Sequence, residues 1–320
     1  MKIQILGTVN GLQNEGMRNV ATHLAKSLGK DSTVYYSGLK SPFAILRNSC
    51  RADATLVFAR ANKLVYWLTR LVTVLCKNTW LVCVQEPMPE FLDCSRRTPL
   101  RCHYFYISAP DMKNLTPREG YRAVPLSVGI DTVKFSPVSA ERQAELKKTY
   151  GFDPEKPLVV HVGHASPGRG LEDFLSLDGA KYQRMVVLSG MFEDEGATGR
   201  LEAAGIQIHR GYLPNVEQIF QMADVYLFPT RSNEFVISIP LSVMEALSCG
   251  TPAVGYESLT GLGEIPCDSG SIRRIQDAGE LNGAVAALVS RKGSVSLLKD
   301  GKSWDEAADL VRQELRSVGK

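Results

Sequence analysis

One carboxylate of the chain, Glu245, lies in an otherwise apolar stretch. Its neighbours on the two sides are Val243, Met244, Ala246 and Leu247. An ionised carboxylate is costly in such surroundings unless it is exposed to water or accepts hydrogen bonds. Glu245 therefore either belongs to a helix face that is turned to solvent, or it accepts hydrogen bonds from two ribose hydroxyl groups of a bound nucleotide.

The residues around Glu245 predict a strand, a polar loop and a helix. An apolar run ends at Phe228 and Pro229. Ser238 and Pro240 predict the N-cap and the first-turn proline of the helix, and Gly250 predicts its end. In an open α/β sheet the carboxyl ends of the strands face the ligand crevice, so this loop and helix N-terminus suit an anionic group.

A second segment, residues 158–175, has the order of a phosphate-binding loop. An apolar strand over residues 158–162 is followed by a loop with Gly163, His164 and Arg169, and then by a helix. Backbone amides and a helix N-terminus give fixed positive potential, and an arginine adds a cation that binds phosphate bidentately. His164 helps fully only when it is protonated. The alternative for Arg169 is a surface arginine in a turn.

Residues 244–254, which read MEALSCGTPAV, resemble the donor motif of the retaining glycosyltransferases of family four, which have the two-domain GT-B fold. The family motif contains two Glu residues at a fixed spacing. Glu245 matches the second, and its implied role is to bind the ribose. Ile237 stands where the first is expected, and the nearest acid is Glu234. The donor sugar is then expected to contact either Glu234 or the backbone amides near Ser238 and Ile239.

The same resemblance implies roles in three further segments. The pairs Gly163-His164 and Arg169-Gly170 stand where family members place cations on the donor diphosphate. Tyr212 lies in a segment that resembles the family's loop beside the nucleotide base, and it either stacks on the base or packs in the core. Residues 260–264 resemble the glycine loop that follows the donor helix, with Gly261 as the implied donor contact.

The amino end predicts a βα unit with a glycine loop. A strand over residues 2–7 and the glycines of residues 11–16 precede an amphipathic helix. The chain contains no GxGxxG fingerprint and no full GxxxxGK[ST] loop, which argues against dinucleotide dehydrogenases and P-loop enzymes. By the family resemblance, Gly16 and Arg18 lie against the cleft. The Arg18 side chain either binds an anionic acceptor or only faces solvent on the surface of its helix.

The fourth predicted strand ends at Val84-Gln85-Glu86-Pro87, where family enzymes often carry a His that touches the donor sugar. Gln85 or Glu86 therefore contacts the sugar or the acceptor, unless the segment is only a polar strand end. No metal ligands are expected. The candidate catalytic residues are thus Arg169, His164, Glu234 and Glu86.

Alternating strand and helix patterns predict an α/β protein with parallel sheets. The family resemblance implies the GT-B fold, in which two Rossmann-like domains have parallel sheets that face a central cleft. Strands are expected over residues 32–36, 54–58, 81–85, 103–107 and 123–128. We expect an acceptor-side Rossmann-like domain over residues 1–137 and a nucleotide-sugar-binding one over residues 138–302. A capping box begins at Ser303, and the family resemblance implies that the final helix, 303–320, packs back on the first domain.

Length and composition agree with a soluble two-domain enzyme, since 320 residues with 44% apolar and 22% charged residues suit two cores of ordinary size. The net charge of +3 is unevenly spread. Basic clusters attract phosphate-bearing partners, and an anionic membrane or lipid-linked acceptor fits the family better than nucleic acid. The basic residues that crowd the first domain are Lys40, Arg47, Arg51, Arg60, Lys63, Arg70, Lys77, Arg96, Arg97 and Arg101.

Residues 64–76 are too short, and too interrupted by Arg70, to span a bilayer. They predict either an interfacial helix or a helix buried against the sheet.

The seven cysteines form no CxxC pair, which favours reduced thiols in a cytoplasmic protein over disulfides or zinc. The first residues do not resemble a signal peptide.

The family resemblance implies transfer of a hexosyl group from a nucleotide diphosphate sugar to a hydroxyl of a glycan or lipid-linked acceptor, with retained anomeric configuration. The leaving diphosphate itself takes the acceptor's proton, so no protein nucleophile, metal ion or cofactor is needed, and the protein stabilises the leaving group. Two alternatives stay open: a GT-B sugar-nucleotide epimerase and a non-catalytic module that binds a sugar nucleotide.

Overall fold

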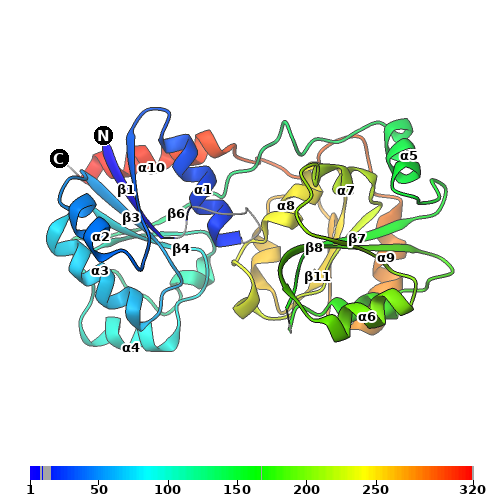
Figure 1. Cartoon of the computed structure of the whole chain (residues 1–320), viewed down its shortest axis with the longest axis horizontal. Helices are drawn as coiled ribbons and strands as arrows, with labels where there is room; N and C mark the ends of the chain where they lie inside the picture. The colour runs from blue at the N-terminus through cyan, green and yellow to red at the C-terminus, as the bar shows by residue number, and fades with distance from the viewer. Residues whose placement is uncertain (8, 10–15, 167, 319–320) are drawn as a thin grey trace. The chain divides into compact units, whose positions relative to one another are not determined.

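The computed structural model describes residues 1–7, 9, 16–166 and 168–318. They form two compact units, each with its own parallel sheet and surrounding helices (Figure 1). Unit 1 comprises Met1–Gly129, Ile237–Ile239 and Lys302–Lys320, and unit 2 comprises Ile130–Val236 and Pro240–Gly301. The prediction of an α/β protein with two parallel sheets is confirmed.

The sheet of unit 1 has the order β2-β1-β3-β4-β5-β6, and all its neighbouring strands are parallel. The two central strands β3 and β4 are buried along their whole length, as expected for a sheet that is covered on both faces. The strand order reverses between β1 and β3. The strands are β1 (Lys2–Gly7), β2 (Thr33–Ser37), β3 (Ala54–Phe58), β4 (Thr79–Cys83), β5 (His103–Tyr106) and β6 (Ala123–Pro125).

The helices of unit 1 form two layers around this sheet. One layer contains α2 (Pro42–Ser49), α3 (Lys63–Leu75) and α4 (Pro89–Arg97), and the other contains α1 (Gly16–Leu28) and α10 (Trp304–Val318) (Figure 1). The core between the first layer and the sheet includes Val57, Tyr66, Leu81, Phe91 and Tyr104.

The last helix, α10, packs on α1. The predicted capping box is confirmed, because the Ser303 N–H donates to Glu306 Oε2 at 2.7 Å and the Glu306 N–H donates to Ser303 Oγ at 3.2 Å. Trp304 stacks on His23 with ring centroids 4.9 Å apart. These contacts join the two ends of the chain in one unit.

The sheet of unit 2 has the order β12-β11-β10-β7-β8-β9, again with parallel neighbours. Its order reverses between β7 and β10. The strands are β7 (Leu158–Ala165), β8 (Gln183–Glu193), β9 (Gln207–Arg210), β10 (Val225–Phe228), β11 (Ala253–Tyr256) and β12 (Ile272–Ile275), and the helices are α5 (Ala140–Thr149), α6 (Glu195–Ala203), α7 (Glu217–Met222), α8 (Leu241–Ser248) and α9 (Leu281–Val289).

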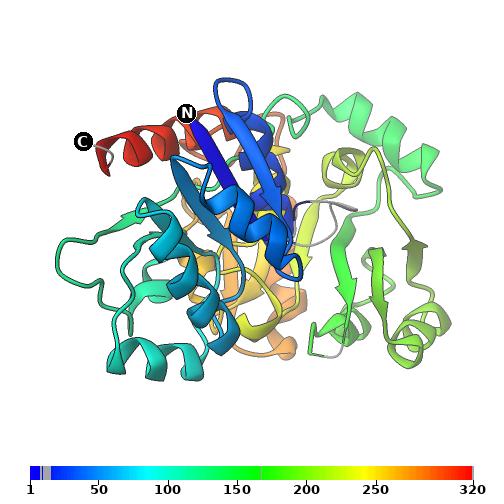
Figure 2. The same ribbon diagram turned by 60° about the vertical axis from the view of Figure 1, so that its left-hand side comes forward.

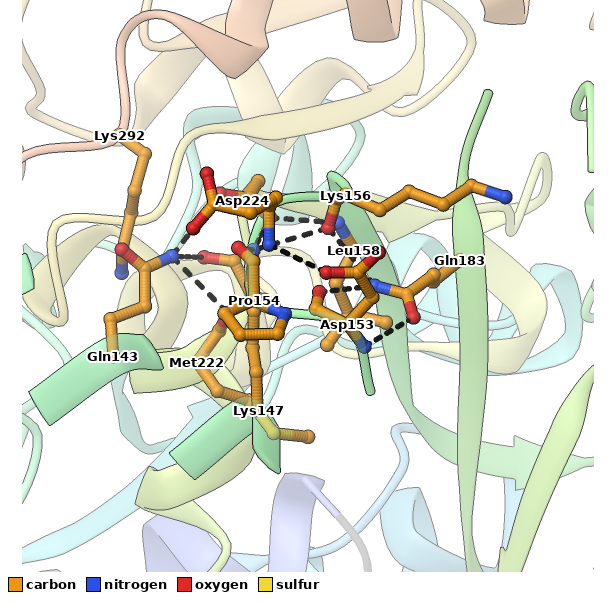
Figure 3. A network of polar contacts seen from close by, with 12 residues as sticks. Gln143, Lys147, Asp153, Pro154, Lys156, Leu158, Gln183, Met222, Asp224 and Lys292 are labelled. Carbon is orange, nitrogen blue, oxygen red and sulfur yellow. Dashed lines mark hydrogen bonds and ion pairs between the residues drawn. The ribbon is translucent and has the colours of Figure 1, made fainter. Parts of the chain in front are cut away.

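A buried polar network holds the amino edge of this second sheet (Figure 3). Lys147 of α5 pairs with Asp224 at 2.7 Å, and the Lys147 side chain is only 4% exposed. The other contacts of Asp224 are with the backbone N–H of Leu158 at 2.7 Å and with Gln143 Nε2 at 3.2 Å. Ligands of open α/β sheets bind at the opposite edge. The network therefore ties α5 to β7 and β10 and belongs to the structure of the unit.

Most observed strands agree with the predicted ones, with small shifts at their ends. The strand expected over residues 158–162 instead continues to Ala165 as β7, so Gly163 and His164 lie in the strand, and the helix expected after the loop is the short 3-10 helix η2 (Leu171–Ser176). The strand expected over residues 54–58 coincides with β3. The strand expected over 81–85 begins and ends two residues earlier, as β4. The Thr55 N–H donates to the Asn78 carbonyl at 2.9 Å, which brings Thr79 into the sheet. As a result, Gln85 lies beyond the strand end.

Candidate functional site

Three loops meet at the carboxyl edge of the second sheet. β7 and β10 are neighbours where the strand order reverses, and they are followed by loops that include residues 168–170 and 229–240. A third loop follows β11 and contains the 3-10 helix η4 (Thr260–Glu264). The crevice outside such a switch point is where open α/β sheets bind ligands. The predicted phosphate loop and the predicted ribose-binding helix thus belong to the same edge.

Two glycines shape the loop after β7. Gly168 and Gly170 have φ angles of 86° and 71°, in the left-handed region that favours glycine. A Cβ atom on Gly170 would lie 2.3 Å from the carbonyl oxygen of Pro229, so a side chain there would push the two loops apart. The N–H of Arg169 donates to the Ser166 carbonyl at 3.2 Å. Arg169 is therefore held in place by its two glycine neighbours.

The side chain of Arg169 is partly buried at this edge. Burial lowers its pKa, but a guanidinium group remains charged at neutral pH. Within the described part of the chain, its Nε atom is buried and has no hydrogen-bond partner. A buried donor without an acceptor costs free energy, and a charged one costs more. This arrangement suits an anionic ligand with several oxygen atoms, such as a diphosphate.

The two histidines of β7 have different surroundings. His164 is buried, with its Nδ1 atom 2.5 Å from Ser189 Oγ. His161 is fully buried and donates from Nδ1 to the Leu227 carbonyl at 3.0 Å, and burial lowers its pKa to about 3, so it stays neutral. A Cβ atom on Gly163 would lie 2.6 Å from His161 Nε2. Close packing against His161 is therefore one reason for a glycine at position 163, besides the implied role of its backbone amide.

Glu245 lies on α8 among core residues. Val243, Ala246 and Leu247 are fully buried, and Glu245 itself is half-buried. Burial raises the pKa of the Glu245 carboxyl to about 7, and the Lys134 cation opposes this shift. A carboxyl on a solvated helix face would keep its usual pKa. These properties favour the hydrogen-bonding alternative over the solvent-exposed helix face.

The start of α8 differs from the prediction. The helix begins at Leu241 and its N-cap is Pro240, so the predictions of Ser238 as the cap and Pro240 as the first helical residue were wrong. Pro240 has extended backbone with φ −66° and ψ 119°, and it leaves Ser238 outside the first turn. The C-terminal end of α8 agrees with the prediction. Gly250 follows the C-cap residue Cys249 directly and has a φ of 72°, the left-handed conformation that commonly ends a helix.

A network that the sequence analysis missed anchors the loop after β10. Arg231 pairs with Asp173 Oδ1 at 2.7 Å and donates to the Tyr256 hydroxyl at 2.8 Å. The Tyr256 hydroxyl in turn donates to Asp173 Oδ2 at 2.6 Å, and the Arg231 guanidinium lies 4.2 Å from the centre of the Tyr256 ring. The three residues come from distant segments of the chain, so no local pattern could have linked them. They fix the base of the loop that carries Glu234.

The other predicted residues of the donor side occupy varied positions. Glu234 is exposed, and its N–H donates to Ser232 Oγ at 3.2 Å. Ile237, at the place of the family's first Glu, is buried. Tyr212 is 53% exposed, so the alternative that it packs in the core is wrong. Gly261 is buried in η4. Ser238 and Ile239 are half-buried and group with unit 1.

Four predicted residues lie at the carboxyl edge of the first sheet. Gly16 begins α1 and Arg18 lies in its first turn, and both are half-buried. Gln85, half-buried, and Glu86, exposed, follow β4. The predicted glycine loop before Gly16 lies outside the described residues. The structure thus places these four residues on unit 1, and the phosphate and ribose candidates on unit 2.

Residues 142–313, more than half of the chain, match the family model described as glycosyl transferases group 1. The chain therefore belongs to the glycosyl transferases group 1, a family of transferase enzymes. The match includes the loop after β7 and all of α8.

A curated relative is N,N'-diacetylbacillosaminyl-diphospho-undecaprenol alpha-1,3-N-acetylgalactosaminyltransferase from Campylobacter jejuni, with 29% identity over 152 residues. The matched region is 46% of this chain and 39% of that relative. Among solved structures, the Anabaena protein Alr3699/HepE in complex with UDP and glucose has a TM-score of 0.75 and 12% identity, covering 99% of this chain and 100% of that one. A glycosyltransferase from Rickettsia africae has a TM-score of 0.76 and 14% identity, covering 100% and 99%. The predicted GT-B fold class is confirmed.

Proposed function

We propose that the protein transfers a sugar from a nucleotide diphosphate sugar to a hydroxyl group of an acceptor, with retained anomeric configuration. The observation that carries this proposal is Arg169, held between two glycines at the switch point, with a buried Nε atom that has no partner within the described chain. Glu245 on α8 adds a carboxyl whose pKa burial raises to about 7. A cation complements the negative diphosphate of a sugar nucleotide, and a carboxylate can accept hydrogen bonds from its ribose hydroxyls.

Each donor-side residue has a proposed role. Arg169, His164 and the amides near Gly163 and Gly261 stabilise the leaving diphosphate, and Glu245 accepts hydrogen bonds from the ribose. The exposed ring of Tyr212 offers a stacking surface for the base. Contact with the donor sugar falls to Glu234 or to the amides of Ser238 and Ile239, because Ile237 cannot accept a hydrogen bond with its side chain.

The transfer step needs no nucleophile from the protein. The acceptor oxygen attacks the anomeric carbon from the face on which the diphosphate leaves, and the bond from that carbon to the diphosphate oxygen breaks. The leaving oxygen takes the acceptor's proton, so the products are a glycoside and a nucleoside diphosphate. The barrier falls because the Arg169 cation stabilises the charge that grows on the leaving group. We propose that the step requires no metal ion and no cofactor.

The comparisons suggest the first substrates to test. The Anabaena structure contains UDP and glucose, and the name of the Campylobacter relative includes a diphospho-undecaprenol. We propose a UDP-sugar as donor and a glycan or a lipid-linked diphosphate as acceptor. The acceptor side is formed by Gly16, Arg18, Gln85 and Glu86, and Arg18 would meet an acceptor phosphate. The seven cysteines are free thiols, which fits the reducing cytoplasm that we propose as the compartment.

The experiment incubates the chain with UDP-, GDP- and ADP-sugars, with and without lipid-phosphate or glycoside acceptors, and follows the products by mass spectrometry and NMR. We expect acceptor-dependent release of the nucleoside diphosphate and an unchanged anomeric configuration. Arg169→Met should abolish release, whereas Arg142→Met, which alters an exposed arginine paired with Glu145, should not. A sugar altered without acceptor would indicate an epimerase, and binding without turnover a non-catalytic module. Either result would overturn the proposal.

A further inference from the structure

The helix α3 of unit 1 has apolar side chains on two opposite faces. Val65, Tyr66, Thr69 and Val72 are buried and face the sheet. The opposite stripe consists of four exposed residues spaced by three and four positions, the spacing of neighbours on one helix face. The stripe contains Leu64, Trp67, Leu71 and Val74. A helix that served only to cover the sheet would carry polar residues on this outer face.

Helix α2 extends this apolar surface. It lies beside α3 in both views (Figures 1 and 2) and exposes Phe43 and Leu46, three positions apart. We call the six residues of the two helices the outer patch. Eleven large apolar residues are exposed in the described chain, and six of them are in this patch, each at least 50% exposed. Single exposed apolar residues are ordinary, but six of them on two neighbouring helices indicate an interaction surface.

The outer patch lies in a strongly basic part of the chain. Residues 33–85 contain seven Lys and Arg and a single acid, Asp53, which accepts a hydrogen bond from the N–H of Lys2 at 2.7 Å. Arg70 reaches over the Trp67 ring, with its Cζ atom 5.6 Å from the ring centre. The exposed cations of this part are Lys40, Arg47, Arg51, Lys63, Arg70 and Lys77. Apolar and aromatic side chains rimmed by Lys and Arg are typical of surfaces that bind anionic lipid.

From these observations we propose that the outer patch docks on an anionic lipid membrane. Trp67, Leu71 and Phe43 enter the boundary between headgroups and acyl chains, and the cations around them contact lipid phosphates. α3 has 13 residues, about 20 Å of helix, whereas a bilayer core is about 30 Å thick, so the helix lies on the surface. Among the described residues, no helix is both long and apolar enough to cross a membrane.

The charge of the patch argues against a second copy of this chain as its occupant. In a two-fold dimer the same patch is used on both copies, so the two basic rims would lie opposite each other, and like charges repel. A membrane with negative lipids complements both the apolar centre and the basic rim. This inference stands on unit 1 alone and does not rest on the proposed transfer reaction.

The test is sedimentation of the full chain with vesicles of phosphatidylcholine alone or of an equimolar mixture of phosphatidylcholine and phosphatidylglycerol. We expect at least about tenfold tighter binding to the mixed vesicles, weakened by salt. The variant Trp67→Ser/Leu71→Ser should lose binding at least about tenfold. Lys63→Gln/Arg70→Gln should lose most of the preference for the anionic lipid. A matched control, Val133→Ser/Val295→Ser, removes two exposed apolar residues of unit 2 and should bind as the native chain does.

Three results would overturn the inference. Native binding that is absent, or equal on the two kinds of vesicle, would exclude an anionic membrane. Patch variants that bind as tightly as the native chain would place the contact elsewhere. A dimer that the patch variants dissociate would assign the surface to a second copy. Thermal unfolding of each variant shows whether it is folded. Titration of each variant with UDP-glucose tests the proposed donor site separately, so a failure of the proposed transfer function is not mistaken for a loss of membrane binding.

Discussion

Glu245→Gln removes a charge that the structure holds near half ionisation at neutral pH. With a pKa of about 7, the ionised fraction of Glu245 rises from about one tenth at pH 6 to about nine tenths at pH 8. In the role proposed for Glu245, the carboxylate accepts hydrogen bonds from both ribose hydroxyls, whereas the protonated form carries an O–H donor on one of its two oxygens. The affinity of the native protein for UDP-glucose should therefore rise about tenfold over this range, or about 1.4 kcal/mol. The variant should bind about 1–3 kcal/mol more weakly at pH 8, with no such pH dependence.

The assay is calorimetric titration at pH 6, 7 and 8, at constant ionic strength and in buffers of different ionisation enthalpy. UDP-glucose suits it because its diphosphate is esterified at both ends and does not titrate in this range. Binding at pH 7 should release protons from the native protein and none from the variant. A titrating histidine would act with the opposite sign, because its protonated form strengthens anion binding at low pH. A flat or falling affinity between pH 6 and 8, or the same slope in the variant, would refute the reasoning.

The raised pKa of Glu245 also affects the stability of the protein. The folded state holds this proton more tightly than the unfolded chain, whose carboxyl has the ordinary pKa of 4.5. The stability from this group is therefore complete below pH 4.5 and is lost as the pH rises through about 7. Relative to Glu245→Gln, the native protein should lose up to about 3 kcal/mol of unfolding free energy between pH 4.5 and pH 8. Urea denaturation of both proteins measures the difference, and parallel pH profiles would contradict it.

Two further variants test contacts that lie outside the predicted site. Arg231→Met removes the contacts with Asp173 and Tyr256, and because Arg231 is 45% exposed, the unfolding free energy should fall by less than about 1 kcal/mol. UDP-glucose affinity measured by calorimetry should fall several-fold as the loop after β10 loses its anchor, and unchanged affinity would exclude a positioning role. Asp224→Ala leaves Lys147 buried without its counter-charge, and urea denaturation should show a loss of about 3–5 kcal/mol of unfolding free energy. A loss below about 1 kcal/mol, no larger than that of Glu145→Ala in an exposed pair, would contradict the structural role of the network.

The fold could be predicted because its signals are local. The apolar run at 54–58 becomes the buried strand β3, and the spacing of Ser303 and Glu306 becomes the capping box of α10. The position of Glu245 on a helix between two strands was also correct, because apolar periodicity and the glycine at its end are properties of neighbouring residues. Strand order, in contrast, depends on how distant segments pair.

The details of the site could not be predicted for the same physical reason. The contact of Gly170 with Pro229 and the network of Arg231 join segments that only the folded sheet brings together. Ser238 has the side chain of an N-cap, but the extended backbone at Pro240 starts the helix later. The exposure of Tyr212 depends on the packing around β9, which an aromatic residue in a sequence does not reveal. These properties arise from tertiary packing.

The most direct test of the central claim, that the switch point of unit 2 binds the diphosphate of a sugar nucleotide, is one calorimetric titration. UDP-glucose is titrated into the native chain, Arg169→Met and the control Arg142→Met. Methionine keeps most of the side-chain volume and removes the cation. The account predicts that the native chain and the control bind alike, and that Arg169→Met binds at least about tenfold more weakly, since it loses charged hydrogen bonds to phosphate. Equal affinity of all three proteins would contradict it.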